Sequence, residues 1–166
     1  MKKESKKNQK NNTKTNAMRI LESSGVEYTE HMYEGSDFMD GVTIAEKLNQ
    51  PVERVFKTLV AVGKSKKNYV FMVPVAEELN LKAAAAAVGE KSVEMIPVVT
   101  ITDVTGYIRG GCSPIGMKKQ FKTVCDITAK DFEKIIFSGG RRGAQIEMNP
   151  LDLAKLINMD FKAITK

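Results

Sequence analysis

The chain has 166 residues, of which 42% are apolar and 28% charged, so it is long enough for one domain with a real core and short for two. No apolar run approaches the roughly 18 residues that cross a membrane, and the basic start lacks the apolar segment of a secretory signal. Two cysteines do not form a disulfide framework, so we expect a cytoplasmic protein, and the formal net charge of +6 permits a polyanionic partner without requiring one.

The first fourteen residues differ in composition from the rest of the chain. They hold six lysines among Asn, Gln, Ser and Thr, with no apolar residue after Met1. We predict a disordered basic arm over residues 1–14 and a single domain over residues 15–166. Such an arm could add nonspecific affinity for phosphates, but a solvated tail is the favoured interpretation. Without it, the remaining charge is close to balanced.

A short helix and a strand are predicted next. Thr15 or Asn16 can cap a helix over residues 17–22, and residues 26–33 alternate loosely as in a strand. His31 lies in this strand and is the only histidine of the chain. Without a second histidine or a Cys/Asp cluster at ligand spacing, neither a zinc site nor a Ser-His-Asp triad is supported. We therefore predict no catalytic role for His31.

The segment 55–62 is apolar on both faces of a period-two pattern, which is typical of a central strand, yet it contains Lys57. Burying an ammonium group is costly. Our hypothesis is that Lys57 points into a polar cavity and meets an anion or a carbonyl there. The alternatives are a strand at the sheet edge, or a side chain that reaches water along the surface. Residues 69–75 should pair with this strand as a hairpin.

The second half of the chain alternates short strands and helices. Asn80 can cap a helix through Ala87, and Asn149 followed by Pro150 can begin a last helix over 151–157. Strands or strand fragments are predicted over 92–96, 107–109, 123–127, 135–137 and 144–148. Hairpins outnumber regular strand–helix–strand crossovers, so we expect an α+β (mixed α/β) fold, with a curled sheet of about six to seven strands flanked by short helices.

Two glycine-rich loops, residues 110–116 and 138–143, each follow a short apolar segment. Glycines let backbone N–H groups approach a ligand closely, so loops at one end of the sheet would form a cleft suited to a developing oxyanion or a nucleotide sugar. The sequence offers no pair of nucleophile and base and no carboxylate dyad. Cys112 is a possible nucleophile without an identifiable base, and a small filling residue is the favoured interpretation.

At these residues the chain resembles the YbaK/EbsC-type aminoacyl-tRNA deacylases, which are related to the editing domain of bacterial prolyl-tRNA synthetases. The matching stretches are residues 56–59, 74–76, 81–82, 105–107, 110–116 and 138–143, in the expected order. The resemblance implies a barrel-like mixed sheet and hydrolysis of the ester between a mischarged amino acid and tRNA. The preferred substrate would be Cys-tRNA(Pro), with Cys-tRNA(Cys) as a further candidate.

The resemblance also implies roles for particular residues. Lys57 matches the family's key lysine and would be catalytic, while Tyr33 matches a tyrosine at the end of the early strand. The remaining substrate-binding residues would be Phe38, Gly110, Gly111, Cys112, Ser113, Ser138, Gly139, Gly140 and Gln145. Gln145 stands where many members carry Asp, which bears on amino-acid specificity. The family uses no metal or cofactor, and the thiol of the substrate cysteine is thought to attack its own carbonyl.

Three functions stay open at this point. The first is a trans-editing hydrolase that acts at the acceptor end of aminoacyl-tRNA, with prolyl-tRNA synthetase as a candidate partner. The second is a non-catalytic module that binds tRNA or prolyl-tRNA synthetase through the same cleft. The third is a deacylase for another small amino acid, such as Ala-tRNA(Pro).

Overall fold

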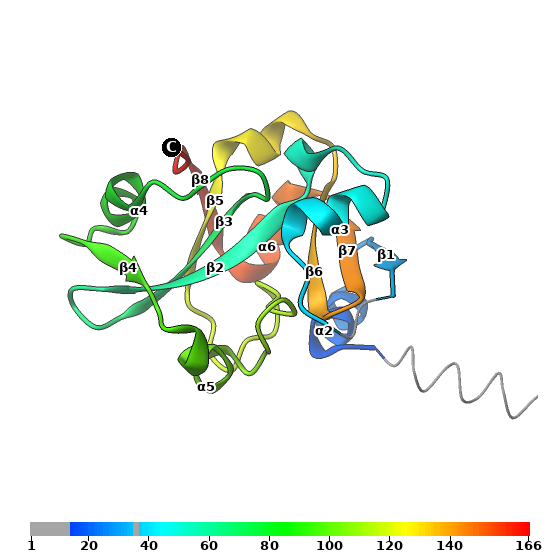
Figure 1. Cartoon of the computed structure of the whole chain (residues 1–166), viewed down its shortest axis with the longest axis horizontal. Helices are drawn as coiled ribbons and strands as arrows, with labels where there is room; N and C mark the ends of the chain where they lie inside the picture. The colour runs from blue at the N-terminus through cyan, green and yellow to red at the C-terminus, as the bar shows by residue number, and fades with distance from the viewer. Residues whose placement is uncertain (1–13, 35–36) are drawn as a thin grey trace, which may run out of the picture.

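The computed structural model describes residues 14–34 and 37–166, and within them the chain forms two β-sheets with helices packed around them (Figure 1). The larger sheet has the strand order β4-β2-β3-β5-β8 and the smaller one the order β1-β7-β6. The predicted α+β class is confirmed. The predicted basic arm lies outside the described residues except for Lys14.

The strands of the larger sheet are β4 (Val93–Met95), β2 (Phe56–Gly63), β3 (Asn68–Pro74), β5 (Lys122–Asp126) and β8 (Met159–Lys162). Those of the smaller sheet are β1 (Thr29–Met32), β7 (Ala144–Met148) and β6 (Ile135–Arg141). The α-helices are α2 (Asn16–Ser24), α3 (Gly41–Lys47), α4 (Leu81–Val88), α5 (Ile101–Thr105) and α6 (Pro150–Ile157). Three 3-10 turns, η1 (Val52–Arg54), η2 (Val98–Thr100) and η3 (Ile127–Asp131), lie between them.

The barrel-like sheet that we expected is not found. Val55 and Ile136 form an isolated parallel bridge between the two sheets, and no longer ladder joins them within the described residues. The larger sheet therefore keeps β4 and β8 as its edges, and the smaller one keeps β1 and β6. Strand β8 was not predicted. The fragment predicted over 107–109 is not a strand, because Gly106 and Gly110 both have positive φ and turn the chain on either side of it.

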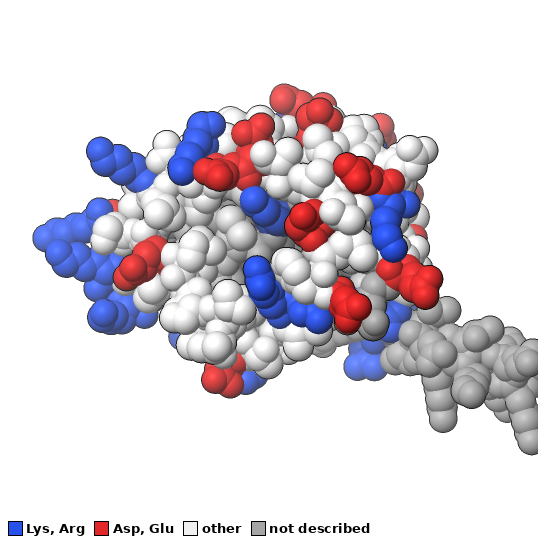
Figure 2. Space-filling view, viewed as in Figure 1, with Lys and Arg blue, Asp and Glu red and all other residues white. Residues whose placement is uncertain are grey.

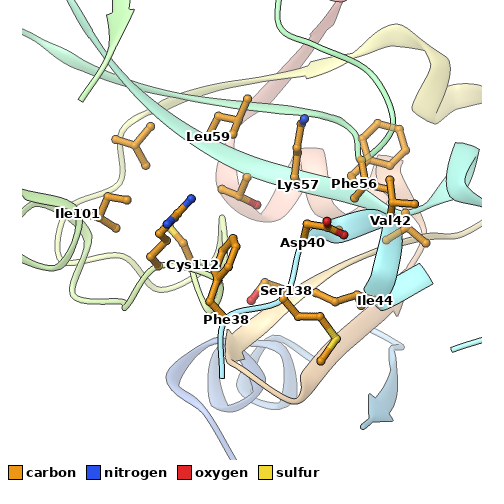
Figure 3. Close-up of a pocket in the computed structure, with 18 of the residues that line it drawn as sticks. Phe38, Asp40, Val42, Ile44, Phe56, Lys57, Leu59, Ile101, Cys112 and Ser138 are labelled. Atoms are coloured by element: carbon orange, nitrogen blue, oxygen red, sulfur yellow. The ribbon is translucent and has the colours of Figure 1, made fainter. Parts of the chain in front are cut away.

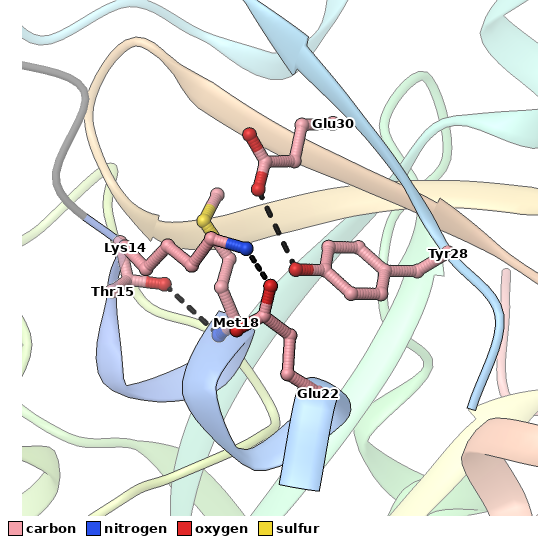
Figure 4. Close-up of polar contacts among 6 residues, drawn as sticks. All are labelled: Lys14, Thr15, Met18, Glu22, Tyr28 and Glu30. Carbon is pink, nitrogen blue, oxygen red and sulfur yellow. Dashed lines mark hydrogen bonds and ion pairs between the residues drawn. The ribbon is translucent and has the colours of Figure 1, made fainter. Parts of the chain in front are cut away.

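The predicted helix starts are confirmed. The side chains of Thr15, Asn80 and Asn149 accept hydrogen bonds from backbone N–H groups in the first turns of α2, α4 and α6. Figure 4 shows the start of α2, where the Thr15 hydroxyl accepts from the Met18 amide at 3.2 Å and Lys14 forms an ion pair with Glu22. These caps satisfy donors that a helix start would otherwise leave unpaired.

Strand β2 separates two apolar clusters, and this arrangement positions the site. The predicted hairpin with β3 is confirmed, with Lys57 opposite Val73. On one face, Leu59 and Ala61 pack in a cluster that includes α4. On the other face, Val60 packs with residues of the 107–117 segment. Figure 1 shows α4 and α5 on opposite sides of β2, as these clusters require.

Candidate functional site

A pocket of about 560 Å³ opens where β2, the start of α3, the β4–α5 segment and the two glycine-rich loops meet (Figure 3). Much of its wall is apolar and includes Val42, Met95, Ile96 and Ile101. Figure 2 shows the hollow near the centre of this face, with both basic and acidic side chains bordering it. Pockets of this size and character bind small molecules or the end of a larger one.

Six of the eleven residues that the sequence pointed to line this pocket. They are Phe38, Lys57, Gly110, Cys112, Ser138 and Gln145. They come from five separate parts of the chain and are brought together because β6 and β7 pair as neighbours of the 110–116 loop. Ser138 and Gln145 lie opposite each other in the β6–β7 register.

Tyr33 and Ser113 do not line the pocket. The Tyr33 amide donates to the Gly143 carbonyl at 2.9 Å, so this residue extends β1 beside the β6–β7 turn. Ser113 is fully buried, and its hydroxyl accepts from the Ile115 amide at 3.3 Å. Both residues therefore shape the backbone around the site.

The other three predicted glycines are not among the residues that line the pocket. A Cβ atom on Gly111 would lie 2.9 Å from the Cα atom of Arg141, so the two glycine-rich loops touch backbone to backbone at this point. At Gly139 and Gly140 a Cβ atom would instead meet side chains near the start of α2, those of Met18 and Thr15, each at 3.1 Å. Gly111 therefore lets the two loops touch, while Gly139 and Gly140 leave room for the start of α2.

Lys57 lies at the rim of the pocket and is half-buried. Strand β4 pairs only with residues 61–63, so the edge of β2 opposite β3 is open near Lys57. Strand alternation puts the Lys57 side chain on the α4 side of β2, and Figure 3 shows it extending away from Ser138. The pKa of the Glu78 carboxyl is lowered mainly by its hydrogen bond with Lys166, and the positive charge of Lys57 contributes.

Thr58 lines the pocket from the opposite face of β2 and was not among the predicted site residues. Its Oγ1 atom is buried and has no hydrogen-bond partner within the described part of the chain. Across the pocket, the Ser138 hydroxyl accepts from the Gly140 amide at 3.3 Å, which leaves its O–H free to donate elsewhere. The two hydroxyls add uncharged hydrogen-bonding positions to a wall that is largely apolar but also includes Asp40, Lys57 and Gln145.

Cys112 is poorly suited to act as a nucleophile. Burial raises the pKa of its thiol to about 11, so the thiol is protonated at neutral pH. The imidazole of His31 is 2.6 Å from Glu147 Oε1 on β7, and His31 is not among the pocket residues. No group of three or more His, Cys, Asp or Glu side chains in residues 14–34 and 37–166 is arranged to hold a metal ion.

The comparisons with known proteins give the class to which this fold and pocket belong. Residues 38–156 match the family model described as "Aminoacyl-tRNA editing domain", and the chain belongs to this family. The resemblance drawn from the sequence is thereby confirmed. The chain is also 45% identical over 157 residues to a protein of Enterococcus faecalis named "Putative Cys-tRNA(Pro)/Cys-tRNA(Cys) deacylase EbsC", covering 94% of this chain and 96% of that protein.

Two solved structures share the fold at low sequence identity. The structure of "hypothetical protein APE2540" matches with a TM-score of 0.83 at 18% identity, over 92% of this chain and 100% of that one. The structure of "a putative trans-editing enzyme for prolyl tRNA synthetase" matches with a TM-score of 0.78 at 21% identity, over 91% of this chain and 95% of that one. None of the helices described for this chain has the length and apolar character needed to cross a bilayer.

Proposed function

We propose that this protein is an aminoacyl-tRNA deacylase that removes cysteine from mischarged Cys-tRNA(Pro), and from Cys-tRNA(Cys) when it is offered. The observation that carries the proposal is a small, largely apolar pocket with the hydroxyls of Thr58 and Ser138 in its wall but no activated nucleophile. Its one thiol, Cys112, is protonated and lacks a base. Family membership and the name of the 45% identical relative support the substrate class.

The missing nucleophile is explained if the substrate provides it. The thiol sulfur of the esterified cysteine attacks its own carbonyl carbon, so a C–S bond forms and the carbonyl oxygen becomes an oxyanion. Collapse of this intermediate breaks the ester C–O bond, and the ribose oxygen leaves with the proton that the thiol gave up. The cyclic thioester that remains is then hydrolysed by water to free cysteine.

The pocket residues have distinct roles in this scheme. Donors of the 110–116 loop stabilise the oxyanion, while the hydroxyls of Thr58 and Ser138 orient the amino acid. Lys57, at the rim, donates a hydrogen bond that stabilises the ribose oxygen of the terminal nucleotide as it departs and takes up the thiol proton. Gln145 bonds the substrate without adding charge, where an Asp would attract its ammonium group.

The test is the release of amino acid from purified Cys-tRNA(Pro), Ala-tRNA(Pro) and Pro-tRNA(Pro). Wild type should release cysteine alone, Lys57→Ala should abolish the release, and the exposed Lys155→Ala should serve as a matched control. Ser-tRNA(Pro), in which a hydroxyl replaces the thiol, should react far more slowly. No release above the spontaneous rate from any of these substrates would refute the proposed reaction.

Two further outcomes separate the alternatives. If Lys57→Ala weakens tRNA binding and wild type shows no turnover, the protein is a binding module. Equal rates on Cys-tRNA(Pro) and Cys-tRNA(Cys) would indicate that the domain reads mainly the acceptor end. Prolyl-tRNA synthetase is then the proposed partner that restricts it to proline tRNA, and adding the synthetase should restore a preference for tRNA(Pro).

A further inference from the structure

Two arginines are stacked around one aromatic ring at the mouth of the pocket. The guanidinium carbon of Arg109 lies 4.1 Å from the centroid of the Phe38 ring, and that of Arg142 lies 5.9 Å from the same centroid. Phe38 and Arg109 line the pocket, yet 44% of Phe38 is exposed. Cation–π contacts of this kind hold guanidinium groups in place at the surface.

The cluster of Phe38, Arg109 and Arg142 is also fixed by the backbone. Arg142 Nε donates to the Arg109 carbonyl at 2.9 Å, which joins the second glycine-rich loop to the first. A Cβ atom on Gly110 would lie 3.0 Å from Phe38 Cδ1 and 3.2 Å from Arg142 Nε. Gly110 therefore packs directly against the cluster, and a larger residue at this position would displace the side chains of Phe38 and Arg142.

The two guanidinium groups of this cluster lie at the mouth of a pocket whose lining also includes Asp40. Among the residues that the structure describes, neither Arg109 nor Arg142 forms an ion pair with a carboxylate. Two positive groups held around one ring repel each other, and a bound anion relieves this repulsion. Guanidinium groups bind phosphate through two parallel N–H bonds, which gives direction as well as attraction.

We propose that this cluster binds the phosphodiester group on the 5′ side of the terminal nucleotide of the aminoacylated RNA. The inference rests on the proposed function, because the esterified amino acid fills the pocket and its ribose lies at the mouth. The first phosphate beyond that ribose then meets Arg109 and Arg142. The site thereby distinguishes the end of a polynucleotide from a free amino-acid ester.

The experiment compares two small substrates and two ligands. The substrates are the 2′(3′)-cysteinyl esters of adenosine and of adenosine 5′-monophosphate, which differ only in the phosphate. The ligands are adenosine and adenosine 5′-monophosphate, whose binding is measured by calorimetry without any reaction. For wild type, kcat/KM should be at least about tenfold higher for the phosphorylated ester, and Kd at least about tenfold lower for adenosine 5′-monophosphate than for adenosine. Both differences should shrink as the salt concentration is raised.

The variants are Arg109→Gln, Arg142→Gln and their combination. Each single change should cut the preference several-fold, and the double variant should bring it close to one. Phe38→Leu should lower it too, because the ring holds both guanidiniums. Arg19→Gln, an exposed arginine on α2, is the matched control and should keep the full preference.

The outcomes separate the inference from the function beneath it. Equal binding of the two ligands by wild type, or a preference that survives in the double variant, would overturn the phosphate site even if both esters are cleaved. Failure to cleave either ester would count against the proposed deacylase, while the binding comparison would still decide the phosphate site.

Discussion

Replacing Thr58 with valine should make the protein more stable and less active at once. Thr58 Oγ1 is buried without a partner in the described residues, and such a hydroxyl costs about 1–3 kcal/mol of stability. Valine has nearly the same shape and removes this cost. Because the hydroxyl borders a pocket, we expect a gain at the low end of this range, about 1 kcal/mol, which raises the melting temperature by roughly 2–4 °C. Loss of one hydrogen bond to substrate should lower kcat/KM about fivefold.

The assay pairs thermal unfolding with deacylation of Cys-tRNA(Pro), and Thr123→Val is its control. Thr123 is also buried in the larger sheet, but its hydroxyl donates to the Phe121 carbonyl at 3.0 Å. Its replacement should therefore destabilise the protein by about 1 kcal/mol and leave activity unchanged. A Thr58→Val protein with a lower melting temperature, or with wild-type kcat/KM, would refute the reasoning.

Three further changes follow from the same structure. Gly111→Ala should lower stability by about 1–3 kcal/mol, measured as a lower melting temperature, and should also reduce kcat/KM. The reason is that the new Cβ atom would lie 2.9 Å from the backbone of the second glycine-rich loop, and that backbone cannot easily move away. Alkylation of Cys112 by iodoacetamide at pH 7.5, monitored by mass spectrometry, should be about a hundredfold slower than that of a free thiol, because burial raises the pKa of Cys112 from 9.0 to about 11. Labelling as fast as that of a free thiol would contradict this. Burial alone would raise the pKa of the Glu147 carboxyl, but hydrogen bonds from His31 and Arg54 outweigh it, and the pKa is lowered from 4.5. A carboxyl group whose pKa is lowered by folding stabilises the protein at pH values above its ordinary pKa, and this stability is lost as the pH falls through the folded-state pKa. Glu147→Gln should therefore lower the melting temperature at pH 7 and have little effect on it at pH 3.

The sequence predicted those features that depend on local chemistry. The caps of α2, α4 and α6 follow from single side chains at helix starts, and the β2–β3 hairpin follows from two apolar runs around a polar turn. Strand β8 escaped prediction because it depends on parallel pairing with β5, a contact distant in sequence. Whether the two sheets join into one depends likewise on which strand edges meet, and short strands do not encode this.

Six of the residues expected from the sequence line the candidate pocket, whereas residues that tertiary packing brings there were not anticipated. Arg109 directly precedes the first glycine-rich loop, but its importance appears only once Phe38 is found beneath its guanidinium. Tyr33 was expected to bind substrate because it matches a tyrosine of the family, yet its amide pairs with Gly143 and holds it at the β6–β7 turn. A motif gives residue types and order, while the direction of each side chain follows from the strand or turn that carries it.

Strand β2 shows why a lysine and a threonine side by side can serve one site. Alternation sends Lys57 and Thr58 to opposite faces, which for an internal strand would place them in separate environments. Here β4 covers only residues 61–63, so both faces of the first half of β2 reach the same pocket around an open edge. The open edge thus resolves the conflict between an apolar strand and its lysine: the ammonium stays at the rim near water while the hydroxyl is buried inside. Extending β4 to cover this edge would close the pocket, and for this reason we regard the shortness of β4 as part of the site.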